Sequence, residues 1–335
     1  MRFATYNVEW FDALFDNKGR LQRDGQWSAR HNVTRGQQSD ALGTVFTAMD
    51  ADAVMVIEAP DTNSKRSTTK ALVNFSETYD LRTREVVTGF VNTTQQEIAL
   101  LYDPDVLTVS HTPKGGEDGP APRFDGVLHI DLDIDATKDA VTFSKPPLEV
   151  HARTTQGRNL HLIGAHLKSK APHGARNRDE VMQMAIANRR KQLAQAIWLR
   201  RRVDDLVSSG GSVIVMGDLN DGPGLDEYED LFGRSSVEIV LGQGDTALFD
   251  PHADTALSGR LAGRPSTARF FLPRPDRFLQ ALLDYIMVSK DLRARQGEWR
   301  IWHPFDDPKC WSDPVLRDAL LLASDHFPVT LDIDL

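Results

Sequence analysis

The chain has 335 residues, of which 40% are hydrophobic and 26% are charged, as is usual for a globular protein. Its 48 acidic residues outnumber its 39 Lys and Arg, and the net charge of −9 argues against a grip on nucleic acid that covers the whole surface. The single cysteine, Cys310, excludes an intramolecular disulfide and a thiolate metal cluster, and is interpreted as structural. No apolar run approaches the roughly 20 residues of a membrane span.

We expect one domain over residues 1–335, with loop insertions near 112–126 and 242–280. The first residues are already strand-like and leave no room for a signal peptide, which favours a cytoplasmic protein, and we expect it to be a monomer. The elements expected before residue 103 are a strand over 2–8, a polar loop over 11–35, a helix capped by Ser39 and Asp40 and closed by residues 50–52, an apolar strand over 53–57, a helix over 69–78, and strands over 84–88 and 97–102.

The middle of the chain begins with a Gly- and Pro-rich surface loop over residues 112–126. Residues 128–135 then alternate apolar and mostly acidic side chains. The acids can be interpreted as a metal site or as the solvated face of a half-buried strand, and strict alternation favours the strand. Strands over 148–153 and 160–166 form a hairpin, and the second one ends in His166.

A basic segment over residues 168–178 precedes the longest expected helix, over 179–207. Most arginines of this helix are interpreted as a solvated face. Arg176 and Arg178 stand between a candidate site and the start of the helix. They are either part of that solvated surface or ligands of a phosphate.

Residues 213–216 are a continuous apolar run that predicts a core strand, and Asp218 and Asn220 follow it. Because strand side chains repeat with a period of two, both side chains point the same way. A carboxylate that orients a water, beside an amide that holds a phosphoryl oxygen, is half of a hydrolytic site. The alternative is that these residues form only a turn after the strand.

Only weak, irregular elements are expected over residues 222–280. A core strand over 282–288 contains Asp284, whose burial is costly unless the carboxylate has a partner. Asp325 and His326 precede a terminal strand over 329–335. The loops 112–126 and 242–280 are expected to form the rim of the cleft and to determine substrate choice.

Polar side chains therefore stand at or beside the ends of several predicted strands. If those ends converge, carboxylates, amides and imidazoles share one site. Such a set suits Mg²⁺ or Mn²⁺ better than zinc, and it supplies an acid and a base for phosphoryl transfer to water. The residues are Asn7, Glu58, His166, Asp218, Asn220, Asp284, Asp325 and His326.

Six short motifs carry these residues in one order: Thr5-Tyr-Asn7-Val, Val56-Ile-Glu58, His166-Leu-Lys168, Gly217-Asp-Leu-Asn220, Leu283-Asp-Tyr-Ile286 and Ser324-Asp-His-Phe-Pro328. Together they resemble the endonuclease/exonuclease/phosphatase superfamily, typified by deoxyribonuclease I, over nearly the whole chain. The resemblance implies an α/β fold, a four-layer α/β sandwich in which two mixed β-sheets are flanked by helices. It places the site at one end of the sandwich.

The resemblance also implies a role for each oxygen ligand. Glu58 is the principal carboxylate for Mg²⁺ or Mn²⁺, with Asn7 and Asp325 beside it. Asp218 orients or deprotonates the attacking water, and Asn220 holds a phosphate oxygen. The metal polarises the phosphoryl oxygen and stabilises charge on the leaving oxygen.

The histidines have implied roles as well. His326 contacts the scissile phosphate and is held in one tautomer by a hydrogen bond to Asp284. His166 stands where deoxyribonuclease-like members carry a second histidine and where abasic-site endonucleases carry a tyrosine, so an abasic-site repair enzyme is disfavoured. In the deoxyribonuclease-like members a glutamate pairs with this histidine, and Glu97 is the candidate here.

Lys168, Lys170, Arg176 and Arg178 are candidates for binding a second phosphate or a polar head group. The resemblance and the histidine pair favour a metal-dependent phosphodiesterase, first of all a deoxyribonuclease I-like nuclease. The alternative is a small-molecule or lipid-head-group phosphodiesterase or phosphatase of the sphingomyelinase or inositol phosphatase kind. The net acidity favours this alternative. A non-catalytic binding protein is disfavoured because no motif residue is lost.

Overall fold

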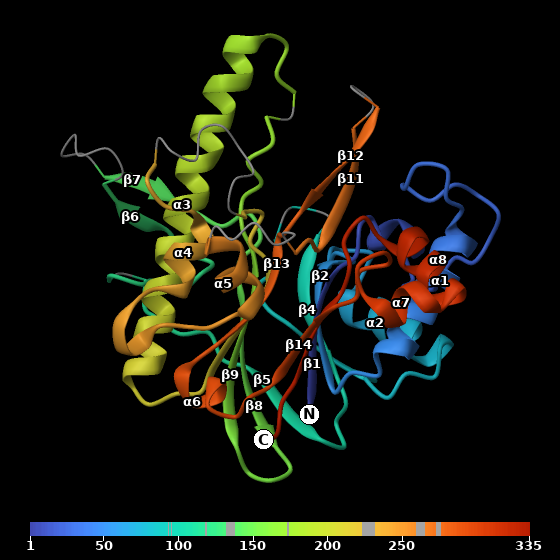
Figure 1. Cartoon of the computed structure of the whole chain (residues 1–335), viewed down its shortest axis with the longest axis horizontal. Coiled ribbons are helices and arrows are strands. Elements are labelled where there is room, and N and C mark those ends of the chain that lie inside the picture. Colours follow the sequence, from blue (N-terminus) through green and yellow to red (C-terminus); the bar gives the residue numbers. More distant parts are fainter. Residues whose placement is uncertain are drawn as a thin grey trace.

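Two β-sheets packed face to face form the centre of the molecule, and helices cover their outer faces (Figure 1). The computed structural model describes residues 1–92, 94, 96–117, 119–131, 138–172, 174–222, 232–258, 265–272 and 276–335. In spatial order, the first sheet contains β14 (Glu298–Ile301), β15 (Val329–Asp332), β1 (Arg2–Asn7), β2 (Ala53–Ala59), β4 (Glu97–Tyr102) and β3 (Glu85–Thr88). The second contains β13 (Asp284–Val288), β10 (Val213–Asp218), β9 (Asn159–His166), β8 (Leu148–Thr154) and β5 (Leu107–His111).

Both sheets are mixed, because β1 pairs with β2 and β9 with β10 in parallel, whereas their other strands pair antiparallel. The central strands read as continuous apolar runs since both of their faces are buried. Between the sheets the packing is close at Gly164, where a Cβ atom would lie 2.4 Å from the sulfur of Met55. Only glycine at this position allows β9 and β2 to approach so closely.

Helices bury the outer face of each sheet. Over the first sheet lie α1 (Arg35–Met49), α2 (Thr68–Thr78), α7 (Pro308–Ser312) and α8 (Pro314–Ala323), and over the second lie α3 (Arg178–Ser208), α4 (Ser236–Leu241) and α5 (Pro251–Leu257). Separate apolar clusters fill the space under each helical layer and the space between the sheets. This arrangement confirms the predicted four-layer α/β sandwich.

Two elements project beyond the same end of the sheets, α3 and a hairpin of two strands (Figure 1). The hairpin consists of β11 (Ala268–Leu272) and β12 (Arg277–Ala281). A second small hairpin contains β6 (Leu128–Ile130) and β7 (Asp139–Val141). The remaining elements are short, namely α6 (Lys290–Arg293) and the 3-10 turns η1 (Phe11–Leu14) and η3 (Gly244–Thr246). Among helices of the described residues, none combines the length and the apolar character that crossing a bilayer requires.

Two expectations from the sequence need correction, and a third is tested only over its first residues. The first helix starts at Arg35 rather than after Ser39 and Asp40, because Thr34 forms a capping box with Gln37. The region 222–280 was expected to be irregular, but it holds α4, η3, α5 and both strands of the β11–β12 hairpin. For the alternating segment 128–135, β6 ends at Ile130, and the acids at 133 and 135 lie outside the described residues.

The sequence predicted a solvated face for most arginines of α3, but the structure buries three of them. Arg189, Arg200 and Arg202 are buried. Arg202 is ion-paired with the buried Glu149 of β8 and donates to the carbonyl oxygen of Ala121 at 2.9 Å. The helix is therefore fixed to the second sheet by internal charge pairs as well as by apolar packing.

Replacement of Arg202 by Ala is expected to lower the free energy of unfolding by about 3–5 kcal/mol, because it leaves the buried carboxylate of Glu149 without its cation. Denaturant unfolding followed by circular dichroism measures this loss. Arg201→Ala is the matched control, because this neighbouring side chain makes an exposed hydrogen bond to Pro120, and its loss should stay within about 1 kcal/mol. Equal losses in the two variants would contradict a stabilising buried pair.

Candidate active site

The ends of strands from both sheets meet at one end of the sandwich. Asn7 ends β1, His166 ends β9 and Asp218 ends β10. Asp218 pairs in register with His166 on one side and with Asp284 of the antiparallel strand β13 on the other. The structure thereby brings together most of the residues that the sequence placed at strand ends. They line a cavity of about 880 Å³, together with Lys168 and Lys170: Asn7, Glu58, His166, Asp218, Asn220 and His326.

Asp218 is fully enclosed and accepts hydrogen bonds from both asparagines of the site. Asn7 Nδ2 donates to its Oδ2 at 3.0 Å and so joins the first sheet to the second. Asn220 donates to the same oxygen through Nδ2 at 3.2 Å and to Oδ1 through its backbone N–H at 2.7 Å. Burial raises the pKa of Asp218, and the nearby Asp284 carboxylate raises it further. Asn220 Nδ2 also donates to the Leu167 carbonyl, so in this structure its amide orients Asp218.

His326 and Asp284 form a buried pair, with 2.8 Å between Nδ1 and Oδ2. Burial alone would lower the pKa of His326, but the Asp284 carboxylate and its hydrogen bond raise it well above the usual value. Asp284 thus has the partner that its burial demands, and the imidazolium Nε2–H is left as a donor. Since His326 lines the cavity, it can offer that proton to a phosphate oxygen.

The oxygen atoms of Glu58, Asn7 and Asp325 fit a hard cation. Glu58 stands at a bulge in β2 with φ of 62°, a strained conformation that re-aims its side chain. Neither Glu58 nor the side chain of Asp325 makes a hydrogen bond or ion pair with any described residue, and Asn7 Oδ1 is buried without a donor. Burial raises the pKa of Glu58 to about 7. A buried oxygen without a donor, such as Asn7 Oδ1, is costly without a ligand, and Mg²⁺ or Mn²⁺ prefers carboxylate and amide oxygens.

A second group of possible ligands is formed by Asp218, Asp284 and His326, whose ligand atoms lie within 4.8 Å of one another. In this group Nδ1 of His326 and Oδ2 of Asp284 already bind each other. The set around Glu58 is the better cation site, because its oxygens have no protein partner. A divalent cation at either place would balance the negative charge that the buried carboxylates concentrate here.

Lys145 is a site residue that the sequence analysis missed. It lies in the segment that connects β7 to β8, and its side chain lines the cavity. Its Nζ lies 3.3 Å from Nδ1 of His166. Burial lowers the pKa of Lys145, while the charges of Glu58 and Asp218 oppose this effect. A lysine directly before two prolines, ahead of a core strand, was the only available signal. Its position brings a cation close to the carboxylates of Glu58 and Asp218.

His166 is buried beside this lysine, and its Nε2 lies 3.6 Å from Oδ2 of Asp218. Burial first, and then the charge of Lys145, hold the pKa of His166 well below its usual value. The expected pairing of His166 with Glu97 is not made. Glu97 starts β4 and accepts a hydrogen bond from Nδ2 of Asn92 at 2.8 Å, because its side chain turns into the preceding loop.

The four basic candidates for phosphate binding separate into two pairs. Lys168 and Lys170 line the cavity, whereas Arg176 and Arg178 are exposed at the start of α3 and do not line it. Lys170 Nζ lies 2.7 Å from the buried carboxylate of Asp221, which also binds an arginine of α3. Two of the four candidate cations, Lys168 and Lys170, therefore line the cavity.

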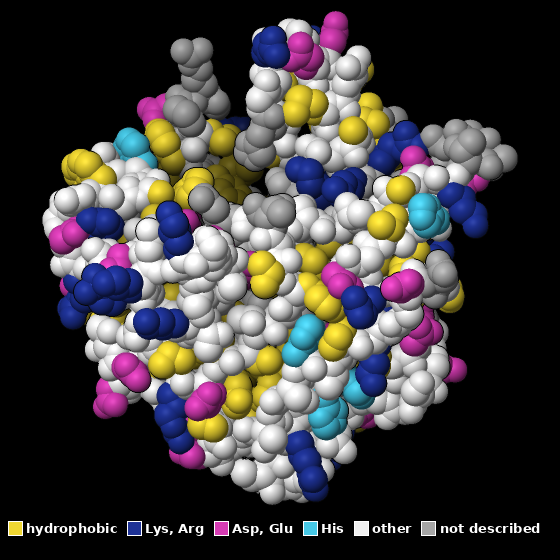
Figure 2. Space-filling model, turned by 180° about the vertical axis from the view of Figure 1, so that it is seen from behind, with side chains coloured by type: hydrophobic (Ala, Val, Ile, Leu, Met, Phe, Trp, Pro, Cys, Tyr) yellow, Lys and Arg dark blue, Asp and Glu magenta, His cyan; other side chains and the backbone are white. Residues whose placement is uncertain are grey.

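An apolar wall also lines the cavity, and its Phe270 ring lies 5.5 Å from the ring of His326. One face of the β11–β12 hairpin supplies most of it, and the first turns of α3 add two smaller side chains. Figure 2 shows the hollow with apolar side chains inside it and Lys or Arg side chains beside it. The wall was not foreseen, because the region 222–280 carried too many Pro and Arg residues to predict a hairpin. Its residues are Phe270, Leu272, Leu279, Ala281, Leu283, Val181 and Ala185.

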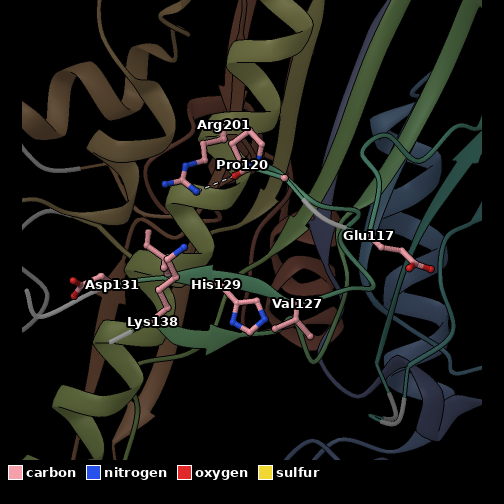
Figure 3. A pocket seen from close by; sticks show the side chains of 9 residues that line it. Glu117, Pro120, Val127, His129, Asp131, Lys138 and Arg201 are labelled. Carbon is pink, nitrogen blue, oxygen red and sulfur yellow. Dashed lines mark hydrogen bonds between the residues drawn. The ribbon is translucent and has the colours of Figure 1, made fainter. Parts of the chain in front are cut away.

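A second hollow of about 560 Å³ lies beside β6 and β7 and shares no residue with this cavity (Figure 3). Acidic and basic side chains both line its described part, among them Glu117, Lys138 and Arg201. Arg201 donates to the carbonyl oxygen of Pro120 at 2.8 Å.

Comparisons with known proteins agree with this geometry. Residues 4–326 match the model of the Endonuclease/Exonuclease/phosphatase family. No curated protein matches the sequence. Solved structures that match over 100% of this chain include three TDP2 structures. Truncated Caenorhabditis elegans TDP2 has a TM-score of 0.51 at 12% identity over 97% of its own length. A longer C. elegans TDP2 has a TM-score of 0.52 at 14% identity, with 75% of its own length covered. D. rerio TDP2 has a TM-score of 0.50 at 12% identity, with 99% of its own length covered. The chain belongs to the endonuclease/exonuclease/phosphatase family.

Proposed function

We propose that this protein is a Mg²⁺- or Mn²⁺-dependent phosphodiesterase that cleaves nucleic acid, in the manner of a deoxyribonuclease I-like nuclease. The observation that carries the proposal is the set of partnerless oxygens at Glu58, Asn7 and Asp325, placed beside Asp218 and the His326–Asp284 pair. The family is one of phosphodiester hydrolases. A nucleic acid substrate is supported by the similar D. rerio TDP2 structure, which contains a single strand DNA product.

The residues of the cavity divide the chemistry between them. Asp218, held by Asn7 and Asn220, accepts the proton of the attacking water or orients it. His326, charged beside Asp284, donates a hydrogen bond to a non-bridging oxygen of the phosphate. When bound, the cation held by Glu58, Asn7 and Asp325 supplies Lewis acidity that stabilises charge on the phosphoryl and leaving oxygens.

The cavity wall favours a second candidate, a phosphodiesterase or phosphatase that acts on a small molecule or a lipid head group. Phe270, Leu279 and Ala281 place an apolar surface directly beside the reacting groups. An apolar substituent on the phosphate, such as a base or an acyl chain, would fit against that surface. The net charge of −9 also disfavours broad electrostatic attraction to a polyanion.

The first expected result is nicking of supercoiled plasmid DNA by the purified protein with Mg²⁺ or Mn²⁺, and no nicking with EDTA, because chelation removes the cation from Glu58. Agarose gel electrophoresis of the plasmid measures it. Hydrolysis of bis(p-nitrophenyl) phosphate under the same conditions is measured in parallel. Hydrolysis of this small diester without plasmid nicking would favour the second candidate function over the nuclease function. Absence of both activities in a folded protein would contradict a phosphodiesterase.

A further inference from the structure

Exposed aromatic rings and guanidinium groups form a continuous strip on the face of the hairpin that is turned away from the cavity. The rings of Phe271 and Phe278 lie 5.3 Å apart, and Arg269 stacks on Phe278 with 3.3 Å between Cζ and the ring centroid. Arg269 also reaches the ring of Phe305 at 5.3 Å, which in turn lies 6.3 Å from the ring of Trp311. These residues, with Arg317 over Trp311 at 5.1 Å, are called the aromatic-arginine strip.

The rings of the strip are unusually open for their type. Phe271, Phe278, Phe305 and Trp311 are 50%, 48%, 39% and 54% exposed. They make up four of the six exposed Trp and Phe side chains among the described residues. These rings come from three separate chain segments and form one connected row. Single exposed aromatic residues are common on protein surfaces, but a contiguous exposed patch marks an interaction surface.

The charges along the strip favour a polyanionic partner. Arg269 has no carboxylate partner among the described residues. Of the acids next to the strip, Asp307 pairs with Arg300 at 2.7 Å and Asp318 pairs with Arg317 at 3.4 Å, whereas Asp306 is exposed beside His303. The cation of Arg269 is therefore available, and it stands between two aromatic rings.

The strip and the catalytic cavity lie on opposite faces of one two-stranded sheet. Strand side chains alternate, so Phe270 and Leu279 face the cavity whereas Phe271 and Phe278 face outward. The ring of Phe270 lies 5.5 Å from the ring of His326. A polymer held at His326 can therefore reach the strip by passing around the hairpin within a few of its units.

We propose that the aromatic-arginine strip binds an unpaired segment of a polynucleotide whose scissile phosphate occupies the cavity. Bases of a single strand have free π faces, and these stack on aromatic side chains without sequence preference. Arg269 adds a cation next to the sugar-phosphate chain and a planar group on which bases stack. The inference rests on the proposed nuclease function for the link to the cavity, but the binding surface is tested separately from catalysis.

The test uses binding of a fluorescein-labelled oligothymidylate, followed by fluorescence anisotropy in EDTA so that no cleavage occurs. Trp311→Ala and Phe278→Leu are each expected to weaken binding on the order of tenfold, the loss of one base-stacking contact. Leucine at 278 keeps the hairpin apolar, and residue 311 lies on α7 outside the hairpin. Trp27→Ala is the matched control, because this tryptophan is 70% exposed and does not belong to the strip.

Hydrolysis of bis(p-nitrophenyl) phosphate is measured on the same variants with Mg²⁺ and should be unchanged, since the diester is too small to reach the strip. If both strip variants bind the oligonucleotide as tightly as the original protein does, the proposal is overturned while the phosphodiesterase function stands. If they lose binding to phosphatidylglycerol vesicles and keep oligonucleotide binding, the strip binds a lipid surface and the proposal is again overturned. Failure of the original protein to hydrolyse any diester removes the nuclease function but leaves the binding result readable.

Discussion

Replacement of Asp218 by Asn is expected to lower the turnover of a phosphodiester by on the order of a thousandfold or more. The amide keeps the size of the side chain, but it cannot accept a proton from the attacking water. It also cannot accept hydrogen bonds from Asn7 and Asn220 with both of its terminal atoms, as the carboxylate does. The variant should remain folded, because burial already makes the charge of Asp218 costly.

Initial rates with a fluorogenic diester, at saturating Mg²⁺, measure this loss, and circular dichroism measures the fold. Asp245→Asn is the matched control, since this carboxylate is fully exposed and pairs only with Lys290 at the surface. Its rate should equal that of the original protein. A rate for Asp218→Asn within tenfold of the original would show that the activity lies elsewhere.

Replacement of Asp284 by Asn is expected to lower turnover by on the order of a hundredfold. The change removes the carboxylate that charges His326 and fixes its Nδ1, so the imidazole loses both its orientation and its Nε2–H donor strength. Turnover is compared among Asp284→Asn, His326→Ala and the double variant. If the two residues act as one unit, the double variant is no slower than the slower single variant. Multiplicative losses would contradict that unit and would give Asp284 a separate role.

The sequence was sufficient for the positions of the site residues on their strands. Predicted strands ended at or beside Asn7, Glu58, His166 and Asp218, and the carboxyl ends of parallel strands share one edge of a sheet. The ordered motifs then implied the sandwich that the structure shows. The pairing of Asp284 was also foreseen in part, because a buried carboxylate demands a partner.

Other features depended on contacts between distant segments, which local patterns do not contain. The spacing of arginines in α3 does not reveal that Arg202 meets Glu149 on another strand. The side chain of Glu97, at the start of β4, accepts a hydrogen bond from Asn92 and does not pair with His166. Lys145 stands in a loop without periodicity, so only the tertiary fold shows that it enters the cavity. The alternation in β11 and β12 was short and bordered by prolines, which concealed the hairpin.

The hydrogen bond from Asn7 to Asp218 has a mechanical consequence. It crosses from one sheet to the other, and the expected cation ligands and the catalytic carboxylate therefore belong to different layers of the sandwich. A shear of one sheet against the other by as little as a bond length would separate them while each sheet kept its own ladder. The close contact of Gly164 with Met55 locks the layers against such sliding. The alignment of the candidate site thus depends on the packing between the layers rather than on any single loop.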